Sequence, residues 1–524
     1  MKFVILGLFC TLIWGCGNLK FSQNKESLES EKHRPLFHHS PSKAWMNDPN
    51  GMVYLDGVYH LFYQFNPDST VWGPMHWGHA TSMDLVHWEE QDIALYPDSL
   101  GTIFSGSAVV DKDNTAGFGE NALVAIFTHH NPQIEQEKTG KHQYQSIAYS
   151  KDKGKTWIKY EGNPVLPNPG IWDFRDPKVM WHEGTAQWIM TLATKQTITF
   201  YGSPDLKRWS RLSEFGEGIG VHDGVWECPD LISFHKEGKT IWALLVSINP
   251  GGPNGGSATQ YFVGDFDGKT FTALDKENRW IDYGRDNYAG VTFSNTGGRR
   301  IFMGWMSNWD YANEVPTLNW RSANTLPREL DLQAVNDKWY ITSNPVNELD
   351  KITEPPSTIG ELVIRDSVSL LEQFDSIPKI FRLDFTGPSD KDFTVRLSNG
   401  KQEEVLIGYN AVKKEYFMDR TQAGNITFSN NFPSIQLAPR ISKDDEVEIS
   451  LFVDVASMEL FADGGLTVMT DIFFPTEDFD NITLISDKHV TIRNLQLSAI
   501  RPTKDWPNSP SGKFEDRNIS AFYK

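Results

Sequence analysis

The sequence predicts an all-β protein, a five-bladed β-propeller followed by a C-terminal β-sandwich. The chain contains 18 Trp, 32 Phe and 16 Tyr residues, with 41 Gly and 28 Pro spread along it. This composition favours short strands joined by turns over long helices. Two short patterns, a hairpin tip and a strand start, also recur along the chain, as they do in repeat architectures. With 524 residues, 39% of them hydrophobic, the chain can hold two domains with separate cores.

Residues 1–17 are predicted to be a secretory signal peptide. Lys2 provides the positive start, and the apolar run 3–14 is too short to cross a bilayer as a mature span. The residues up to Cys16 resemble a bacterial lipoprotein cleavage box, in which Cys16 would become the lipidated first residue. We therefore expect a bacterial protein that is secreted, periplasmic or held at the cell surface by a lipid anchor. Residues 18–34 are polar and are expected to form a flexible tether.

Cysteine content and charge narrow the range of functions. Only Cys228 lies beyond the signal peptide, so we expect no intramolecular disulfide in the folded part. The chain has 49 basic and 68 acidic residues and a formal net charge of -19, which argues against nucleic acid as a partner. A neutral substrate fits this charge better.

A hairpin tip, Ser-x-Asp ending in an aromatic residue, recurs after apolar strands. Its copies are 82–88, 150–157 and 203–209, with a looser copy at 267–271. We expect these tips to join the outer strands of similar sheets.

After each tip, the next strand begins with an aromatic residue beside polar or small residues. With the first such stretch included, five starts are found: Trp45–Pro49, Phe104–Ser107, Phe174–Pro177, Trp226–Asp230 and Asn287–Gly290. Five equivalent strand starts imply five sheets whose first strands surround a common channel, which is the geometry of a β-propeller. A sandwich or a Greek-key barrel could hold the same strands but would not explain their equivalence.

The domain boundaries follow from these patterns. We expect the propeller to span 35–345, a Pro-containing linker to span 346–361 and an antiparallel sandwich to span 362–502. The polar tail 503–524 is expected to lie outside both domains.

Three acids, Asp48, Asp176 and Glu227, stand at equivalent strand starts and should meet at one end of the propeller. Taken singly, each is better explained as a turn cap or a structural charge. Together in an aromatic-lined pocket they suggest glycoside hydrolysis, in which one carboxylate attacks and a protonated one releases the leaving oxygen. Arg175 beside Asp176 should help to keep nearby carboxylates ionised.

Several motifs closely resemble the signatures of glycoside hydrolase family 32, the fructan hydrolases and invertases. The resemblance covers about residues 35–500. The motifs that carry it are Trp45–Gly51, Phe62–Pro67, Trp72–His79, Phe104–Ser107, Phe174–Pro177, Glu227–Asp230, Gly304–Trp309, Leu326–Leu330 and Phe452–Phe461.

The resemblance implies a retaining enzyme with Asp48 as nucleophile, Glu227 as general acid/base and Asp176 as transition-state stabiliser. It further implies six residues lining a fructose pocket: Asn47, Gln64, Trp72, Ser107, Arg175 and Trp305. The long motifs around Trp72 and Trp305 look most like those of bacterial levanases and exo-inulinases. Their activity would release terminal fructose from levan or inulin, and also from sucrose and short fructo-oligosaccharides.

Some alternatives stay open on the sequence alone. They are a fructosyltransferase or invertase with the same acids, an inverting five-bladed glycosidase for arabinose or xylose polymers, and a non-catalytic carbohydrate-binding propeller. The choice between endo and exo action is also open. No cofactor or metal is expected, because His76 and His79 lack a third ligand and Asp111–Asn114 lacks the spacing of a calcium loop. We expect Cys228 to be a packing residue.

Overall fold

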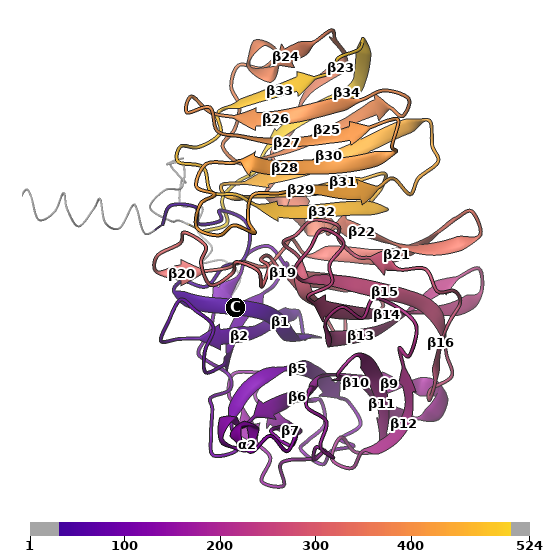
Figure 1. The fold of residues 1–524 in the computed structure, drawn as a ribbon. Helices are drawn as coiled ribbons and strands as arrows, with labels where there is room; N and C mark the ends of the chain where they lie inside the picture. The colour runs from indigo at the N-terminus through magenta and orange to yellow at the C-terminus, as the bar shows by residue number, and fades with distance from the viewer. Residues whose placement is uncertain (1–30, 505–524) are drawn as a thin grey trace, which may run out of the picture.

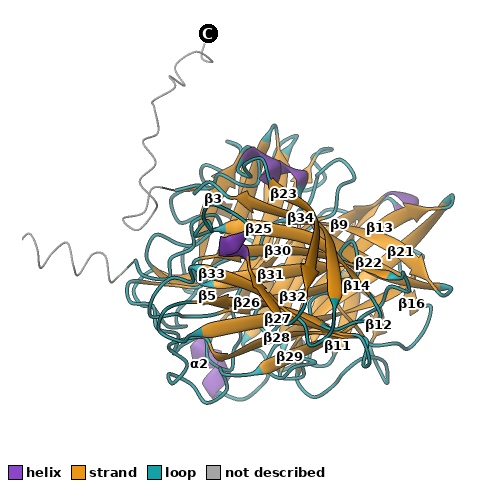
Figure 2. Cartoon of the chain, turned by 90° about the horizontal axis from the view of Figure 1, so that it is seen from above, coloured by secondary structure: helices purple, strands orange, loops and turns teal. Residues whose placement is uncertain are grey.

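The computed structural model describes residues 31–504, and it consists of two β domains in contact with each other. Figure 1 shows a propeller of sheets in the lower part of the molecule and a layered sandwich above it. Strands form nearly all of the regular structure, with only short helices at the periphery (Figure 2). The predicted signal peptide with Cys16, most of the predicted tether and residues 505–524 lie outside the described residues.

Five antiparallel sheets form the blades of the propeller. Blade I contains β1 (Ala44–Leu55), β2 (Val58–Asn66), β3 (His76–Ser82) and β4 (Glu89–Glu90). Blade II contains β5 (Thr102–Asp111), β6 (Ala122–His130), β7 (Gln143–Ser150) and β8 (Ile158–Lys159). Blade III contains β9 (Phe174–His182), β10 (Gln187–Thr194), β11 (Thr197–Ser203) and β12 (Ser210–Phe215). Blade IV contains β13 (Val225–Lys236), β14 (Lys239–Asn249), β15 (Ala258–Phe266), β16 (Phe271–Ala273) and β17 (Arg279–Trp280). Blade V contains β18 (Tyr288–Thr292), β19 (Ile301–Trp305), β21 (Arg328–Val335) and β22 (Lys338–Pro345).

The first strands of the five blades form a closed ring. Strand β1 contacts β5, β5 contacts β9, β9 contacts β13, β13 contacts β18, and β18 contacts β1 again. Strand β20 (Trp320–Arg321), from the end of the propeller sequence, pairs in parallel with the beginning of β1. The ring of five equivalent first strands predicted from the sequence is therefore confirmed.

The recurring tip has similar hydrogen bonds in each of its three close copies. The Asp side chain accepts from one or two backbone N–H groups further along the turn, and the Trp indole donates back to a carbonyl three residues earlier. The three Trp-to-carbonyl pairs are Trp88 with Leu85, Trp157 with Gly154, and Trp209 with Leu206. This shared geometry explains why the same residue types recur at each outer hairpin.

Two six-stranded sheets form the sandwich, and within residues 31–504 three short 3-10 helices and one α-helix complete the fold. One sheet contains, in spatial order, β23 (Ser357–Ile364), β34 (Val490–Ala499), β25 (Phe381–Pro388), β30 (Glu446–Asp454), β31 (Ser457–Ala462) and β32 (Thr467–Ile472). The other contains β24 (Ser367–Ser369), β33 (Asn481–Ile485), β26 (Phe393–Ser398), β27 (Glu404–Asn410), β28 (Glu415–Gln422) and β29 (Ile435–Pro439). The helices are α2 (Pro132–Gln136), η1 (Glu183–Thr185), η2 (Asn347–Lys351) and η3 (Leu370–Glu372).

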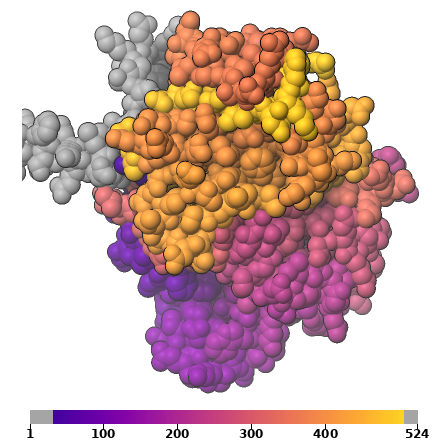
Figure 3. Space-filling view, turned by 45° about the horizontal axis from the view of Figure 1, so that its top comes forward, coloured from indigo at the N-terminus to yellow at the C-terminus, as the bar shows by residue number. Residues whose placement is uncertain are grey.

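The two domains share a hydrophobic cluster and a buried ionic network. Apolar contacts run from Trp45 and Trp305 in the propeller to Phe452 and Phe461 in the sandwich. Figure 3 shows the sandwich packed directly against the propeller. The ionic network joins Arg328 of blade V to Glu459 of the sandwich, and both side chains are fully buried. Apolar and charged contacts therefore join the sandwich to the propeller.

Three boundary residues differ from the sequence-based expectation. Arg34, expected in the tether, is buried and donates to the Ser42 carbonyl at 3.0 Å. Strand β23 begins at Ser357, inside the segment expected to be a linker, because it pairs with β34. Thr503, expected in the tail, donates from its backbone N–H to the carbonyl of Leu36 at 2.8 Å.

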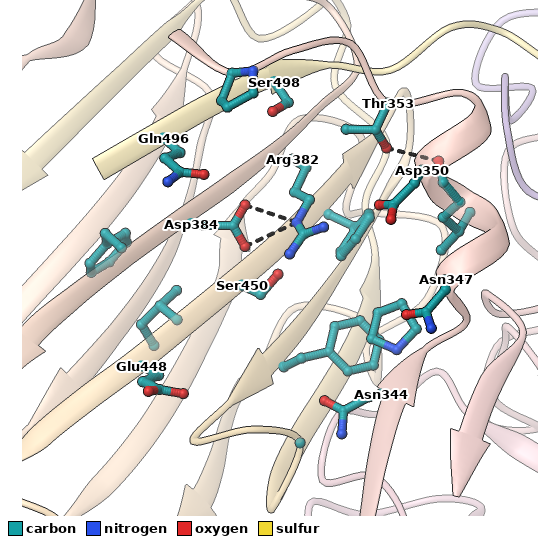
Figure 4. A pocket seen from close by; sticks show the side chains of 18 of the residues that line it. Asn344, Asn347, Asp350, Thr353, Arg382, Asp384, Glu448, Ser450, Gln496 and Ser498 are labelled. Carbon is teal, nitrogen blue, oxygen red and sulfur yellow. Dashed lines mark hydrogen bonds and ion pairs between the residues drawn. The ribbon is translucent and has the colours of Figure 1, made fainter. Parts of the chain in front are cut away.

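A cleft of about 820 Å³ lies where the segment 344–356 meets the outer face of the sandwich. Figure 4 shows polar side chains from both sides of this cleft, including the ion pair between Arg382 and Asp384. None of the three predicted acids lines it. Within residues 31–504, no helix is long and apolar enough to cross a membrane.

Candidate active site

Every first strand carries a β-bulge or irregular step near its beginning, and the three predicted acids stand at or beside these steps. The register shifts occur between Met46 and Pro49, Ile103 and Gly106, Arg175 and Lys178, Glu227 and Asp230, and Tyr288 and Val291. Bulges re-aim side chains and are enriched beside active sites. The equivalent strand starts in the sequence thus correspond to equivalent backbone irregularities in space.

Three non-glycine residues at these steps have left-handed backbone conformations. Asp176 has φ 63°, Cys228 has φ 44° and Ala289 has φ 52°. These residues directly follow Arg175, Glu227 and Tyr288, respectively, which occupy equivalent positions in their motifs. A non-glycine residue in this region costs roughly 1–2 kcal/mol. Contacts in the rest of the fold must compensate for this backbone strain, which lies next to the three acids.

Asp48 is oriented by two neutral donors. Asn47 Nδ2 donates to Oδ1 at 2.9 Å, and Ser105 Oγ donates to Oδ2 at 2.8 Å. Asn47 is itself held by the Trp45 indole, which donates to its Oδ1 at 2.7 Å. Burial and the nearby charge of Glu227 raise the pKa of Asp48 to about 6, although both donors act in the opposite direction.

Both oxygens of Glu227 are occupied by donors from neighbouring blades. Arg175 donates to Oε1 from Nη2 at 2.9 Å and from Nε at 3.1 Å. The Tyr288 hydroxyl donates to Oε2. Arg175 also binds Asp173 Oδ1 at 2.6 Å. The Glu227 carboxyl group is therefore fixed from blades III and V, while its own strand belongs to blade IV.

Asp176 is buried beside the other two acids. The backbone N–H of Cys228 donates to its Oδ2 at 3.1 Å, and its own N–H donates to Thr128 Oγ1 at 3.1 Å. Burial raises the pKa of Asp176 to about 7; Arg175 acts against this shift, and Glu227 and Asp48 add to it. The acid thus has a higher proton affinity than an ordinary aspartate.

Cys228 shows directly that the acids converge. Its Sγ lies 3.9 Å from Asp48 Oδ2 and 3.7 Å from Asp176 Oδ2, and Glu227 is the preceding residue. Burial and the adjacent acids raise the pKa of the Cys228 thiol, so it remains protonated. Arg175, which donates to Glu227 Oε1, also lies 4.0 Å from Asp176 Oδ2. The structure therefore brings Asp48, Asp176 and Glu227 together in one place. Among the described residues, no group of three or more His, Cys, Asp or Glu side chains could hold a metal ion.

Comparisons with protein-family models agree with this arrangement. The model of the glycosyl hydrolases family 32 N-terminal domain matches residues 38–345, and the family 32 C-terminal model matches residues 349–499.

The chain belongs to glycoside hydrolase family 32.

Similar family 32 proteins come from bacteria and fungi. A levanase of Bacillus subtilis (strain 168) is 44% identical over 500 residues, covering 92% of this chain and 72% of its own length. The extracellular exo-inulinase of Aspergillus niger is 38% identical over 516 residues, covering 91% of this chain and 96% of its own length. The crystal structure of the Aspergillus awamori exo-inulinase superposes with a TM-score of 0.83 at 35% identity, covering 90% of this chain and 99% of that one.

The other predicted family 32 subsite residues have different environments. Trp305 is fully buried, with its ring centroid 5.9 Å from that of Trp45 and 6.4 Å from that of Tyr288. Gln64 is also buried, and its Nε2 has no hydrogen-bond partner among the described residues. Trp72 is 45% exposed. We infer that Gln64 retains hydrogen-bonding capacity for a ligand, since a buried amide without a partner is costly.

Ser107 is placed differently from the prediction. It is buried between blades II and III, where its Oγ donates to the Pro177 carbonyl at 2.9 Å and accepts from Val179 N at 3.0 Å. The serine that contacts Asp48 is Ser105. The irregular step between Ile103 and Gly106 determines which hydroxyl reaches the acids, and the family motif alone does not specify this.

Sequence reasoning did not single out Ser105 or Tyr288 as site residues. A signal for both was present, because they occupy the same position in their strand starts as Arg175 and Glu227. The four side chains at this position interact with the acids or with one another across the blades. Comparing equivalent positions across blades, rather than reading each motif alone, would have identified them.

Proposed function

We propose that this protein is an exo-acting, retaining β-fructosidase that releases fructose from levan, inulin, short fructo-oligosaccharides and sucrose. The observation that carries the proposal is the convergence of Asp48, Asp176 and Glu227, linked by the contacts of Cys228 and Arg175. The proposal is supported by relatives named as levanases and exo-inulinases. A further structural relative, the β-fructofuranosidase of Schwanniomyces occidentalis, was solved in complex with fructosyl-erythritol.

In the proposed mechanism, Asp48 attacks C2 of a terminal β-fructofuranosyl unit while Glu227 protonates the departing oxygen. Glu227 then removes a proton from the water that frees fructose, so that two inversions give overall retention. Arg175 and Tyr288 hold the Glu227 carboxyl in position for both steps. Asp176 hydrogen-bonds the sugar hydroxyls and stabilises the positive charge that develops on the ring.

Fructose release tests this proposal directly. The wild type should liberate fructose from levan, inulin and sucrose, and Asp48→Ala and Glu227→Gln should each lower kcat by about 100- to 10,000-fold. Asp152→Asn is a matched control, because Asp152 is an acid of the same propeller that binds Thr156 in an outer hairpin tip. Activity of the control should remain at the wild-type level.

Two outcomes would overturn the assignment. A folded wild type that binds fructans without releasing fructose would indicate a carbohydrate-binding propeller. Formation of more fructosylated oligosaccharide than free fructose from sucrose would indicate a fructosyltransferase with the same acids. Both products can be separated and quantified by chromatography over time.

We further propose that the protein is exported. The apolar run 3–14 and the sequence up to Cys16 support export with lipidation of Cys16, and the Aspergillus niger relative is named as extracellular. Cell fractionation of the wild type and of Cys16→Ser tests this step. A lipid anchor predicts that the wild type stays with the membrane fraction and that the variant loses this association; equal partitioning of the two would refute it.

A further inference from the structure

Two tryptophans differ from the others in exposure. Among the tryptophans of residues 31–504, Trp72 and Trp172 are the most exposed, at 45% and 40%. Trp72 lies in the connection between β2 and β3, and Trp172 lies immediately before β9. Large exposed aromatic rings on an otherwise folded surface often mark binding sites.

A continuous series of ring contacts connects these tryptophans through blade II. The Phe104 ring lies 6.2 Å from Trp72 and stacks on His130 at 4.4 Å with an interplanar angle of 1°. His130 contacts His142 edge-on at 5.4 Å, and His142 lies 4.5 Å from Trp172. We call these five side chains the aromatic strip.

Both halves of the aromatic strip are connected to the catalytic acids. Phe104 precedes Ser105, whose hydroxyl donates to Asp48 Oδ2 at 2.8 Å. Trp172 precedes Asp173, which binds Arg175 at 2.6 Å, and Arg175 in turn binds Glu227. His130 also ends β6 opposite the start of β5, at the same end of the blade. The strip therefore lies beside the acids, at the same end of the propeller.

The loop that presents Trp172 is fixed before any ligand binds. Asn168 Oδ1 accepts from the backbone N–H groups of Gly170 and Ile171, both at 2.8 Å, and its Nδ2 donates to the Ile171 carbonyl. A Cβ on Gly140 would lie 2.6 Å from the Gly170 carbonyl oxygen, so the loops before His142 and Trp172 pack backbone to backbone. A fixed aromatic surface loses little conformational entropy on binding.

The two imidazoles of the strip are neutral at neutral pH. Burial lowers the pKa of His130 to about 4 and also lowers the pKa of His142. Glu135 of α2 contacts both rings, with its carboxylate 3.2 Å from His130 Nε2 and 4.0 Å from His142 Nε2. His142 is buried and His130 is nearly so. The two imidazoles therefore support the strip from within, and its exposed rings are those of Trp72 and Trp172.

We propose that the exposed rings of the aromatic strip bind the sugar units of a fructan chain that follow the cleaved bond, with Trp172 as the distal binding residue. This inference rests on the proposed fructosidase function. Sugar rings present apolar C–H faces that pack on flat aromatic surfaces, and tryptophan supplies the largest such area at low entropic cost. Four ring-to-ring steps of 4.4–6.2 Å connect the exposed Trp72 to the exposed Trp172. This path is longer than one sugar ring and suits a chain rather than a single sugar.

The test compares a long and a short substrate in the same enzyme. Trp172→Ala should lower kcat/KM for a fructan polymer about fivefold to tenfold more than it lowers kcat/KM for sucrose, mainly through KM. Trp172→Phe, which keeps an aromatic face, should recover most of the loss. Ile158→Ala changes another exposed apolar residue, on the outermost strand of blade II, and should affect neither substrate.

Binding without turnover provides a second readout. In a Glu227→Gln background, calorimetry with an inulin-type hexasaccharide should show a dissociation constant about fivefold higher when Trp172→Ala is added. Equal losses of kcat/KM on polymer and sucrose, or an unchanged dissociation constant, would overturn the role of the strip. Absence of fructose release by the wild type from every substrate would instead overturn the proposed function itself.

Discussion

Removing the Ser105 hydroxyl should shift the acidic limb of the pH profile to higher pH. Ser105 Oγ donates to Asp48 Oδ2 at 2.8 Å and favours the ionised form of this carboxyl. Burial and Glu227 have already raised the pKa of Asp48 to about 6. Ser105→Ala removes a donor that stabilises the charge, so the pKa must rise further. Since Asp48 is proposed to attack as a carboxylate, activity at low pH must fall.

The magnitude follows from the strength of this hydrogen bond. A hydrogen bond to a charged group contributes about 1.5–3 kcal/mol, and about 1.4 kcal/mol corresponds to one pKa unit. Water entering the space left by the hydroxyl recovers part of this, so we expect a rise of about one unit. An apparent pKa that moves from about 6 to about 7 lowers kcat/KM roughly fivefold at pH 6 and hardly at all at pH 8.

The assay is the pH dependence of kcat/KM on sucrose, which reports the ionisation of the free enzyme. Because Asp48 and Asp176 interact, the acidic limb reflects the ionisation of both acids together. The quantity compared between variants is therefore the apparent pKa of this limb. Ser107→Ala is the matched control. Its hydroxyl bonds Pro177 and Val179 rather than an acid, so this variant should lose stability, by about 1–3 kcal/mol, without moving the acidic limb.

Two results would refute the reasoning about Ser105. One is an acidic limb that stays in place or moves to lower pH in Ser105→Ala. The other is a shift of the limb in Ser107→Ala as large as that in Ser105→Ala, which would mean that the shift does not arise from the hydrogen bond between Ser105 and Asp48.

Three further predictions concern the hydrogen bond from Tyr288 to Glu227, the buried acid Asp176, and His38 at the domain interface. Tyr288→Phe removes the donor to Glu227 Oε2 and should lower kcat about tenfold on sucrose and fructans alike; an unchanged kcat would contradict this. The pKa of Asp176 is raised to about 7, so its ionisation costs stability above pH 3.8, and Asp176→Asn should gain on the order of 2 kcal/mol at pH 8 by calorimetry; a lower melting temperature would refute it. Burial lowers the pKa of His38, but bonds to Asp454 and Glu459 outweigh this and raise it to about 9. Its stabilisation is therefore complete below pH 6.5 and lost as pH rises through 9, so Tm of the wild type should fall across this range and that of His38→Gln should not.

The fold could be predicted because its determinants are local. Each outer hairpin repeats the same capped turn, as at Trp88 and Trp209, and each first strand repeats the same irregular start. Such patterns depend on neighbouring residues and are visible without coordinates. The convergence of Asp48, Asp176 and Glu227 then follows from ring closure, since residues at the starts of equivalent strands must meet at one end of the ring.

The remaining details depend on contacts between distant segments. The choice between Ser105 and Ser107 is made by one irregular step in β5, and the partnership of Tyr288 with Glu227 depends on how blades IV and V pack. Arg34 was assigned to a tether because it follows a polar stretch, yet its guanidinium packs over the Trp320 ring. A sequence pattern does not specify such pairings, because they are set by tertiary packing.

The stereochemistry of hydrolysis tests the central claim most directly. If Asp48 forms a covalent intermediate that Glu227 then helps water to resolve, NMR spectra during the first turnovers should show β-fructofuranose as the first product, before mutarotation. Initial appearance of the α-anomer would show a single inverting displacement, and the roles proposed for Asp48 and Glu227 would then be wrong.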